Sequence, residues 1–189
     1  MLLIPAIAGA QALPFTIADT NPVTLAKGTS GLTETSSISH SAFTNVAAVP
    51  FSESSLDVSA GYAMWQPAGV NSNVINVAGA YNMNGKLGIA AGLYYGMNPS
   101  YEMTDASGAS KGRFNPTDMH AAVGVSYRFI PALSVGANIG YATSSLAAGH
   151  SYGTVAADFF LMSQFSDFKV AAGVSNVLGT VESASGAEF

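Results

Sequence analysis

Polar and apolar positions alternate over a long stretch of this chain, from about residue 56 to residue 178. The alternation is clearest over residues 132–142, where one parity is apolar and the other is small or polar. The apolar positions are Leu133, Val135, Ala137, Ile139 and Tyr141, and the intervening ones are Ser134, Gly136, Asn138, Gly140 and Ala142. A period of two residues predicts a β-strand with one apolar face and one face of small or polar side chains.

Seven segments share this alternation and predict seven strands, at about 56–66, 72–83, 86–97, 117–128, 132–143, 153–164 and 168–178. Asn84-Gly85 is a signal for a two-residue hairpin, and the connections at 129–131 and 165–167 are equally short. The connections at 98–116 and 144–152 are longer. Outer-membrane barrels have short periplasmic turns and longer extracellular loops. The turn lengths therefore predict that the 98–116 loop lies outside the cell.

The composition narrows the fold class. Of 189 residues, 49% are hydrophobic and only 9% are charged, against about 25% charged in an average soluble domain. No internal run of about 18 or more consecutive apolar residues predicts a membrane-spanning helix. Low charge combined with alternating strands predicts an all-β fold, an antiparallel transmembrane β-barrel whose apolar face meets outer-membrane lipid.

Aromatic residues gather at both ends of the predicted strands. Tyr81, Tyr127, Phe129, Phe165 and Phe168 lie near the short turns, and Trp65, Tyr94, Tyr95, Tyr141 and Tyr152 lie near the longer connections. Two girdles of this kind are typical of the two membrane interfaces of a barrel. The alternative is the ordinary enrichment of aromatic residues in strands.

The first 55 residues differ from the rest of the chain. Residues 1–12 resemble the apolar core of a signal peptide and end in an A-x-A cleavage site at Ala10-Gln11-Ala12, although no positively charged start precedes them. The mature chain would then begin near Leu13; a buried apolar strand is the alternative. Residues 13–55 are rich in Ser, Thr and Asn and lack long alternation. They are predicted to form a hatch or plug, folded inside or across a lumen, with a short helix or turn near Ser39–Phe43.

The strand parity places several charges on the inward face. With the large apolar residues outward, Lys86, Arg128 and Lys169 point inward near the periplasmic mouth, and Asp158 points inward deeper in the lumen. A basic constriction favours anions such as a carboxylate head group or an acidic peptide. The alternative is that these charges are solvated and only protect the neighbouring turns.

Other chemistry has little support. The net charge is −5 without a basic stripe, so no nucleic-acid partner is expected. The absence of cysteine excludes a disulfide framework and thiolate catalysis. His40, His120 and His150 lack partners at metal-ligand spacing, so neither a metal nor another cofactor is expected. Asp118 and His120 share a strand face but have no nucleophile beside them, so we expect no enzymatic activity.

Several segments, in order, resemble the PorV/PorQ family of outer-membrane barrels, which are relatives of the FadL fatty acid transporters. The family's early A-x-G-G-x-G-like segment is similar to residues 26–31, and its A-x-x-N-P-A element is similar to residues 42–47, with Asn45-Val46 in place of Asn-Pro. A strand ending in aromatic residues resembles residues 59–65, and a strand ending in N-x-G resembles residues 175–179. The loop exit G-x-F-x-P-x-D is matched by Gly112, Phe114, Pro116 and Asp118.

The resemblance spans about residues 23–179 and implies a fold, a location and two functions. Family barrels have about fourteen strands, so the seven predicted at 56–179 would form the N-terminal half of a barrel, in a truncated chain whose residues 180–189 are a tail or part of a loop. The location is the outer membrane of a Gram-negative bacterium. PorV-like proteins serve type IX protein secretion and surface attachment, with secreted proteins or secretion components as partners. FadL-like proteins pass hydrophobic small molecules through a lumen obstructed by an N-terminal hatch. A soluble all-β surface or adhesin-like protein is the remaining alternative.

Overall fold

A computed structural model describes residues 21–28, 31–65, 71–147, 149–166, 168–177, 179 and 182–183. The predicted signal-peptide remnant at 1–12 lies outside the described residues, as do residues 13–20 of the predicted hatch. No helix in the described ranges is long and apolar enough to cross a membrane.

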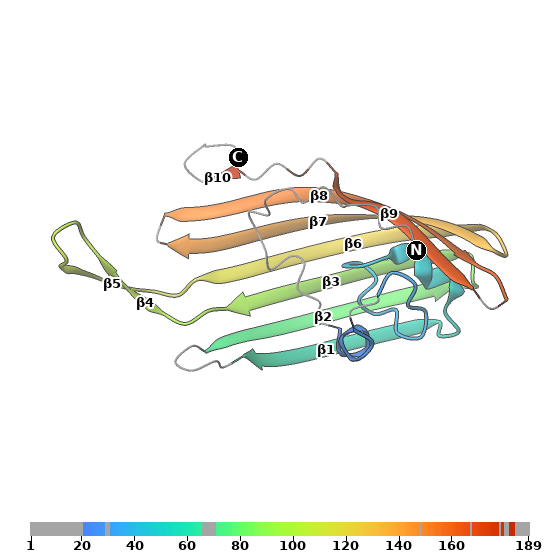
Figure 1. Cartoon of the computed structure of the whole chain (residues 1–189), viewed down its shortest axis with the longest axis horizontal. Coiled ribbons are helices and arrows are strands. Elements are labelled where there is room, and N and C mark those ends of the chain that lie inside the picture. Colours follow the sequence, from blue (N-terminus) through green and yellow to red (C-terminus); the bar gives the residue numbers. More distant parts are fainter. Residues whose placement is uncertain are drawn as a thin grey trace.

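One large antiparallel sheet dominates the structure (Figure 1). Its long strands are β1 (Leu56–Trp65), β2 (Ser72–Met83), β3 (Leu87–Met97), β6 (Thr117–Ile130), β7 (Leu133–Ala147), β8 (His150–Gln164) and β9 (Lys169–Val177). They are neighbours in this order, and every neighbouring pair is antiparallel. The prediction of an all-β, antiparallel fold is confirmed, and so are the seven strands, with shifts of a few residues at their ends.

The turn at Asn84-Gly85 follows from its two residues. Asn84 has a φ of 56° and Gly85 a φ of 67°, the left-handed conformation that a type I′ hairpin requires at both central positions. Asn and Gly tolerate this conformation better than other residues. The local sequence therefore determines where β2 ends and β3 begins.

The sheet is open over the described residues. β1 pairs with β2 alone, and β9 pairs with β8 alone. A short strand, β10 (Glu182–Ser183), pairs with Tyr152 and Gly153 of β8, on the same edge as β9. Two of the residues assigned to the tail at 180–189 thus extend this edge along β8.

The long connection between β3 and β6 contains a second hairpin that the alternation did not reveal. Strands β4 (Tyr101–Thr104) and β5 (Ser110–Phe114) pair with each other in a separate two-stranded sheet, which extends beyond the end of the large sheet (Figure 1). Its tip is a turn held by Asp105, whose carboxylate accepts hydrogen bonds from the Ser107 hydroxyl and from the backbone N–H groups of Ser107 and Ala109. These bonds, led by that of Ser107, lower the pKa of Asp105.

The described residues before β1, 21–28 and 31–55, form an N-terminal segment. This segment lies against one face of the sheet, near the short turns (Figure 1). It contains a short helix, α1 (Pro22–Ala26), and a 3₁₀ helix, η2 (Val46–Phe51). Residues 39–43 form turns rather than a helix. The core consists of side chains from this segment and from the sheet face beneath it: Ile38, Ala42, Val46 and Val49 with Ala80, Ala90 and Ala122, and Ala47, Ala48 and Phe51 with Phe160 and Met162.

Candidate functional site

The two faces of the large sheet differ sharply in charge. In register, the positions that share a face with Val123 in β6 include Val58, Val77, Leu93, Ile139 and Val155. Outside the bulges near the strand ends, the seven long strands carry no Asp, Glu, Lys, Arg or His on this face. Outside the bulges, the residues of these five types in the same strands share the opposite face, namely Asp57, Asp118, His120, Arg128, Asp158 and Lys169. We call the first the outer face and the second the inner face.

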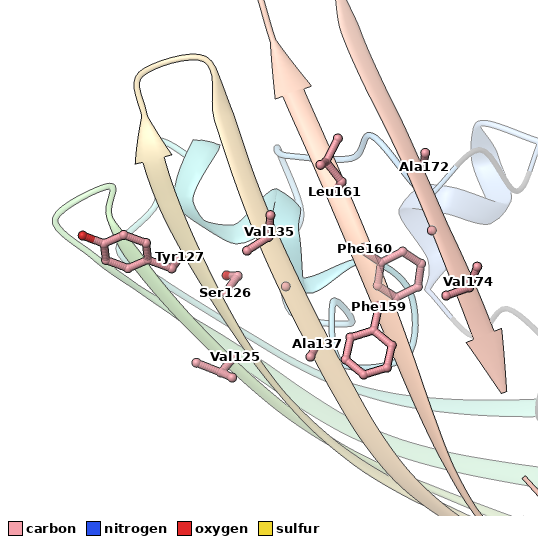
Figure 2. A pocket seen from close by; sticks show the side chains of 12 residues that line it. Val125, Ser126, Tyr127, Val135, Ala137, Phe159, Phe160, Leu161, Ala172 and Val174 are labelled. Atoms are coloured by element: carbon pink, nitrogen blue, oxygen red, sulfur yellow. The ribbon is translucent and has the colours of Figure 1, made fainter. Parts of the chain in front are cut away.

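The outer face is apolar and solvent-accessible. Val123, Val125 and Ile139 in the middle of the sheet are each more than half exposed. Shallow hollows interrupt this surface, and the one drawn in Figure 2 has a volume of about 680 Å³. Its outward lining is Val125, Tyr127, Val135, Ala137, Phe159, Leu161, Ala172 and Val174. An exposed apolar surface of this extent is unusual on a soluble monomer and marks a surface that meets another apolar phase or a partner.

The aromatic residues at the strand ends divide between the two faces. Near the short turns, Tyr127 and Phe129 are exposed on the outer face and pack edge to face, with ring centroids 5.0 Å apart. Near the long connections, Tyr95 and Tyr141 are on the outer face. The assignment of Tyr94 and Tyr152 to the predicted girdle is wrong, because their register places them on the inner face, opposite His120 and Ser144. The side chain of Trp65 lies outside what the structure describes.

Glycine and alanine on the inner face let the N-terminal segment approach closely. A Cβ atom on Gly136 would lie 2.6 Å from Cγ1 of Val46 and 2.8 Å from the backbone nitrogen of Ala47. One on Gly92 would lie 2.3 Å from the ring of Phe43. Real carbon atoms do not approach so closely. At Gly136 the close neighbours include backbone, so the segment must move unless this residue is glycine; at Gly92 the Phe43 ring would have to shift. The small residues of the alternating pattern are therefore the surface that the segment covers.

Polar side chains hold the segment in place. Asn45 is buried and begins η2: its Oδ1 accepts from the N–H of Ala47 at 2.9 Å, and its Nδ2 donates to the carbonyl of Leu32 at 2.7 Å. Asp57 of β1 accepts from the N–H of Ile38 at 2.7 Å. Asn82 of β2 donates to the carbonyl of Ser52 at 2.8 Å.

His40 is a further buried residue of the N-terminal segment that contacts the inner face. Its Nε2 lies 3.2 Å from Oδ1 of Asn76, and its Nδ1 lies 3.2 Å from the hydroxyl of Ser39. The ring of Phe43 lies between the rings of His40 and His120, at 6.5 Å and 5.1 Å between centroids. Alternation located the face but not these buried polar contacts, since they join residues far apart in the sequence.

The basic residues of the predicted constriction contact the protein itself. The guanidinium of Arg128 lies 4.5 Å from the centroid of the Phe51 ring and donates to the carbonyls of Pro131 and Pro50. Lys169 donates to the hydroxyl of Thr35 at 2.5 Å. Lys86 is exposed in the turn before β3, so its assignment to the strand is wrong. Two of the three side chains thus hold the N-terminal segment, and the third lies at the turn.

Asp158 belongs to a bulge rather than to a cluster of ligands. One of its carboxylate oxygens accepts from the backbone N–H of Asn176 at 2.8 Å. Asn176 has a φ of 58°, and the pairing of β8 with β9 shifts between Ala157 and Phe159. The carboxylate thus stabilises an irregular strand end.

The residues of the loop-exit motif tie the β4–β5 hairpin to the sheet. The ring of Phe114 packs against Tyr101 with centroids 6.0 Å apart. The carbonyl of Pro116 accepts from the N–H of Asn98 at 2.9 Å. Asp118 accepts from Nδ2 of Asn98 at 2.9 Å and from the hydroxyl of Ser144 at 2.6 Å. Gly112 has a φ of 105°, which favours glycine.

No cluster of chemistry-bearing side chains gathers in the part of the chain that is described. There, no three residues among His, Cys, Asp and Glu are placed to hold a metal ion. Asp118 uses both carboxylate oxygens in hydrogen bonds within the protein. The candidate site is therefore a pair of surfaces: an apolar outer face and a small, polar inner face covered by the N-terminal segment.

Neither a comparison with known protein-family models nor one with curated proteins finds a match for this chain.

Proposed function

We propose that this chain forms part of the wall of an outer-membrane β-barrel protein of PorV/PorQ type, which serves type IX protein secretion and surface attachment in a Gram-negative bacterium. The observation that carries the membrane part of the proposal is the partition of charge between the two faces. Outside the bulges, every Asp, Glu, Lys, Arg and His of the seven long strands is on the inner face, while the outer face is apolar.

Contact of the outer face with lipid explains this partition of charge better than contact with water does. In a soluble sheet with one covered face, the other face carries the polar side chains. Here the covered face is the one that carries the charged residues of the long strands, and the exposed face is apolar. A strand in a barrel wall alternates apolar outward with polar inward, and aromatic residues such as Tyr81, Tyr127 and Phe129 suit the interface with the lipid head groups.

The N-terminal segment supports a hatch within such a barrel. Residues 38–51 pack on the inner face near the short turns, where Asn45, Asp57 and Arg128 hold them. In the proposed orientation this is the periplasmic half of the lumen. Arg128 and Lys169 then anchor the hatch through Pro50 and Thr35.

The assignment to secretion rests on the motif resemblance. Asn45, at the A-x-x-N-P-A-like element, begins η2, and Asp118, at the loop exit, ties β6 to β7. Both residues therefore have structural roles, as expected for motif positions that maintain a fold. The second candidate, a FadL-like channel for hydrophobic small molecules, rests on the same resemblance and on an N-terminal segment that covers part of the inner face, as a hatch would.

Fractionation tests the membrane proposal first. The protein should stay in the membrane after a wash with carbonate or urea and should require detergent for extraction. Recovery in the aqueous fraction would reject both barrel functions in favour of a soluble surface protein.

Deletion of the gene then separates the two barrel functions. Loss of surface-attached secreted proteins, with normal uptake of a radiolabelled long-chain fatty acid, is the result expected for secretion. Loss of uptake with normal surface attachment would assign the channel function instead. Complementation with the intact gene is the control for both readouts.

A further inference from the structure

Two basic side chains of the β4–β5 hairpin have no partner among the described residues. Lys111 and Arg113 lie two residues apart on β5, and both are exposed. Neither side chain forms a hydrogen bond or an ion pair with another described residue. The other four basic residues are used elsewhere: Arg128 and Lys169 hold the N-terminal segment, Lys27 pairs with Glu34, and Lys86 lies in a short turn.

The acidic residues of the same hairpin do not neutralise these two charges by direct contact. Glu102 is opposite Arg113 in the register of β4 and β5, but among the described residues their side chains form no ion pair. The carboxylate of Asp105 accepts three hydrogen bonds within the tip of the hairpin. Lys111 and Arg113 can therefore bind an anion from outside the chain.

An apolar hollow lies on the outer face, on the side toward this hairpin, and has a volume of about 890 Å³. Its lining includes one row of residues across the sheet and the next row toward the hairpin, namely Ala91, Val123 and Ile139 and then Leu93, Ala121 and Tyr141. The hollow drawn in Figure 2 is on the other side of the first row, toward the short turns. The two hollows thus divide the outer face into a half near the hairpin and a half near the turns.

We propose that Lys111, Arg113 and the hollow near the hairpin bind one phosphorylated glycolipid of the outer leaflet, with its phosphates on the two cations and its acyl chains in the hollow. The proposal rests on the membrane location and orientation proposed above, in which the hairpin lies outside the cell. Arg binds phosphate through two parallel N–H donors, and Lys binds it as a point charge. A zwitterionic phospholipid offers less net negative charge to this pair.

The spacing along the chain fits a lipid of one leaflet. Val123 lies near the middle of β6, and Arg113 precedes it by ten residues, which is at most about 33 Å of extended chain. At a strand tilt of about 45°, this length rises at most about 23 Å. The head groups of a bilayer lie between about 15 and 22 Å from its centre. With Val123 at the centre, Arg113 is therefore near the head groups, and the acyl chains extend down to the hollow.

Lipid binding by the purified protein tests the role of the two cations. The protein is extracted from the outer membrane into a mild detergent, and native mass spectrometry measures its binding of diphosphoryl lipid A and of dioleoylphosphatidylethanolamine. We expect one lipid A per chain and much weaker binding of phosphatidylethanolamine. Each basic residue beside an anionic lipid strengthens binding about fivefold, so the Lys111→Gln, Arg113→Gln double variant should bind lipid A about 25-fold more weakly. Lys86→Gln removes an exposed charge from a short turn and should leave the affinity unchanged.

A second pair of variants tests the hollow. Ala91→Phe places a large side chain in the hollow near the hairpin and should weaken the binding of lipid A. Ala137→Phe is the matched control, because Ala137 is also an outward alanine but lines the hollow near the short turns. It should leave the binding of lipid A unchanged.

Three results would overturn the inference. The first is equal affinity of the double variant and of Lys86→Gln for lipid A, and the second is equal binding of lipid A and phosphatidylethanolamine. The third is a dimer that Ala91→Phe dissociates, since a second copy would then occupy the hollow. Failure of the membrane proposal is a different result, because the protein would then be recovered in the aqueous fraction after the carbonate wash.

Discussion

Substitution of Gly136 by alanine tests the close packing between the N-terminal segment and the inner face. The new methyl group would lie 2.6 Å from Cγ1 of Val46 and 2.8 Å from the backbone nitrogen of Ala47. A flexible side chain cannot relieve the second contact, because it involves backbone. The Ala47 nitrogen also donates to Asn45, and its carbonyl accepts from the hydroxyl of Ser134. The segment must therefore move as a unit.

The magnitude follows from this geometry. Overpacking of a close-packed site costs about 1–3 kcal/mol, and a free energy of that size corresponds to about a 5- to 150-fold change in an equilibrium. We expect the fraction of molecules in which the N-terminal segment is detached from the inner face to be larger in the Gly136→Ala variant by about this factor. The global fold should persist, because the strand pairing of β7 is unaffected.

Thiol labelling measures this opening. The chain has no cysteine, so Ser41→Cys introduces a single reporter at a buried position of the segment. Its reaction with maleimide in detergent should be faster in the Gly136→Ala background by the factor given above. Gly79→Ala is the matched control: it is also a strand glycine, but its new methyl group would face outward with its nearest neighbours at 3.5 Å. Equal labelling rates in the Gly136→Ala and Gly79→Ala backgrounds would refute the close packing.

Three further predictions concern the segment and the outer face. Asn45→Ala should lower the free energy of segment opening by about 1–2 kcal/mol, through loss of a helix-capping bond, and should speed the same labelling reaction; an unchanged rate would contradict the anchoring role. Burial raises the pKa of Glu34, but hydrogen bonds from Lys27 and Ser36 outweigh burial and lower the pKa from 4.5 to about 2. The stabilisation from the ionised Glu34 is therefore present above pH 4.5 and is lost as the pH falls toward 2. Glu34→Gln should reduce the acid sensitivity of the denaturation midpoint between about pH 5.5 and pH 2.5, and identical acid sensitivity of both proteins would count against the ion pair. Val123→Lys should cost about 2–4 kcal/mol in the membrane and reduce the amount of inserted protein, whereas Ala106→Lys at the hairpin tip should not; equal insertion would argue against a lipid-facing outer face.

Local sequence accounts for the strands and their faces. A period of two residues needs only neighbouring positions, so the alternation located all seven long strands, and Asn84-Gly85 specified its turn through the left-handed conformation of both residues. The same parity would have put Tyr94 and Tyr152 on the inner face if it had been applied to them. The β4–β5 hairpin was missed because its strands are too short for the period to stand out, although Asp105 and Gly108 mark its tip.

The charged residues show where sequence reasoning stops. Parity correctly gave Arg128, Asp158 and Lys169 the inner face, but it could not show what each side chain contacts. Arg128 donates to Pro50 and Lys169 to Thr35, and these partners are separated by 78 and 134 residues along the chain. No periodicity connects such positions, so the contacts of Arg128 and Lys169 with the N-terminal segment could not be predicted from the sequence.

The sequence by itself determined the strands, their two faces and the separation of apolar from charged residues, because each depends on the pleat of a single strand. Only the tertiary structure decided what the small residues of the inner face are for and which side chains hold the N-terminal segment. The first depends on contacts between Gly136 and Val46, which the chain makes only when the segment folds back over the sheet. The second depends on contacts such as those of Arg128 with Pro50 and of Lys169 with Thr35, which join residues far apart along the chain.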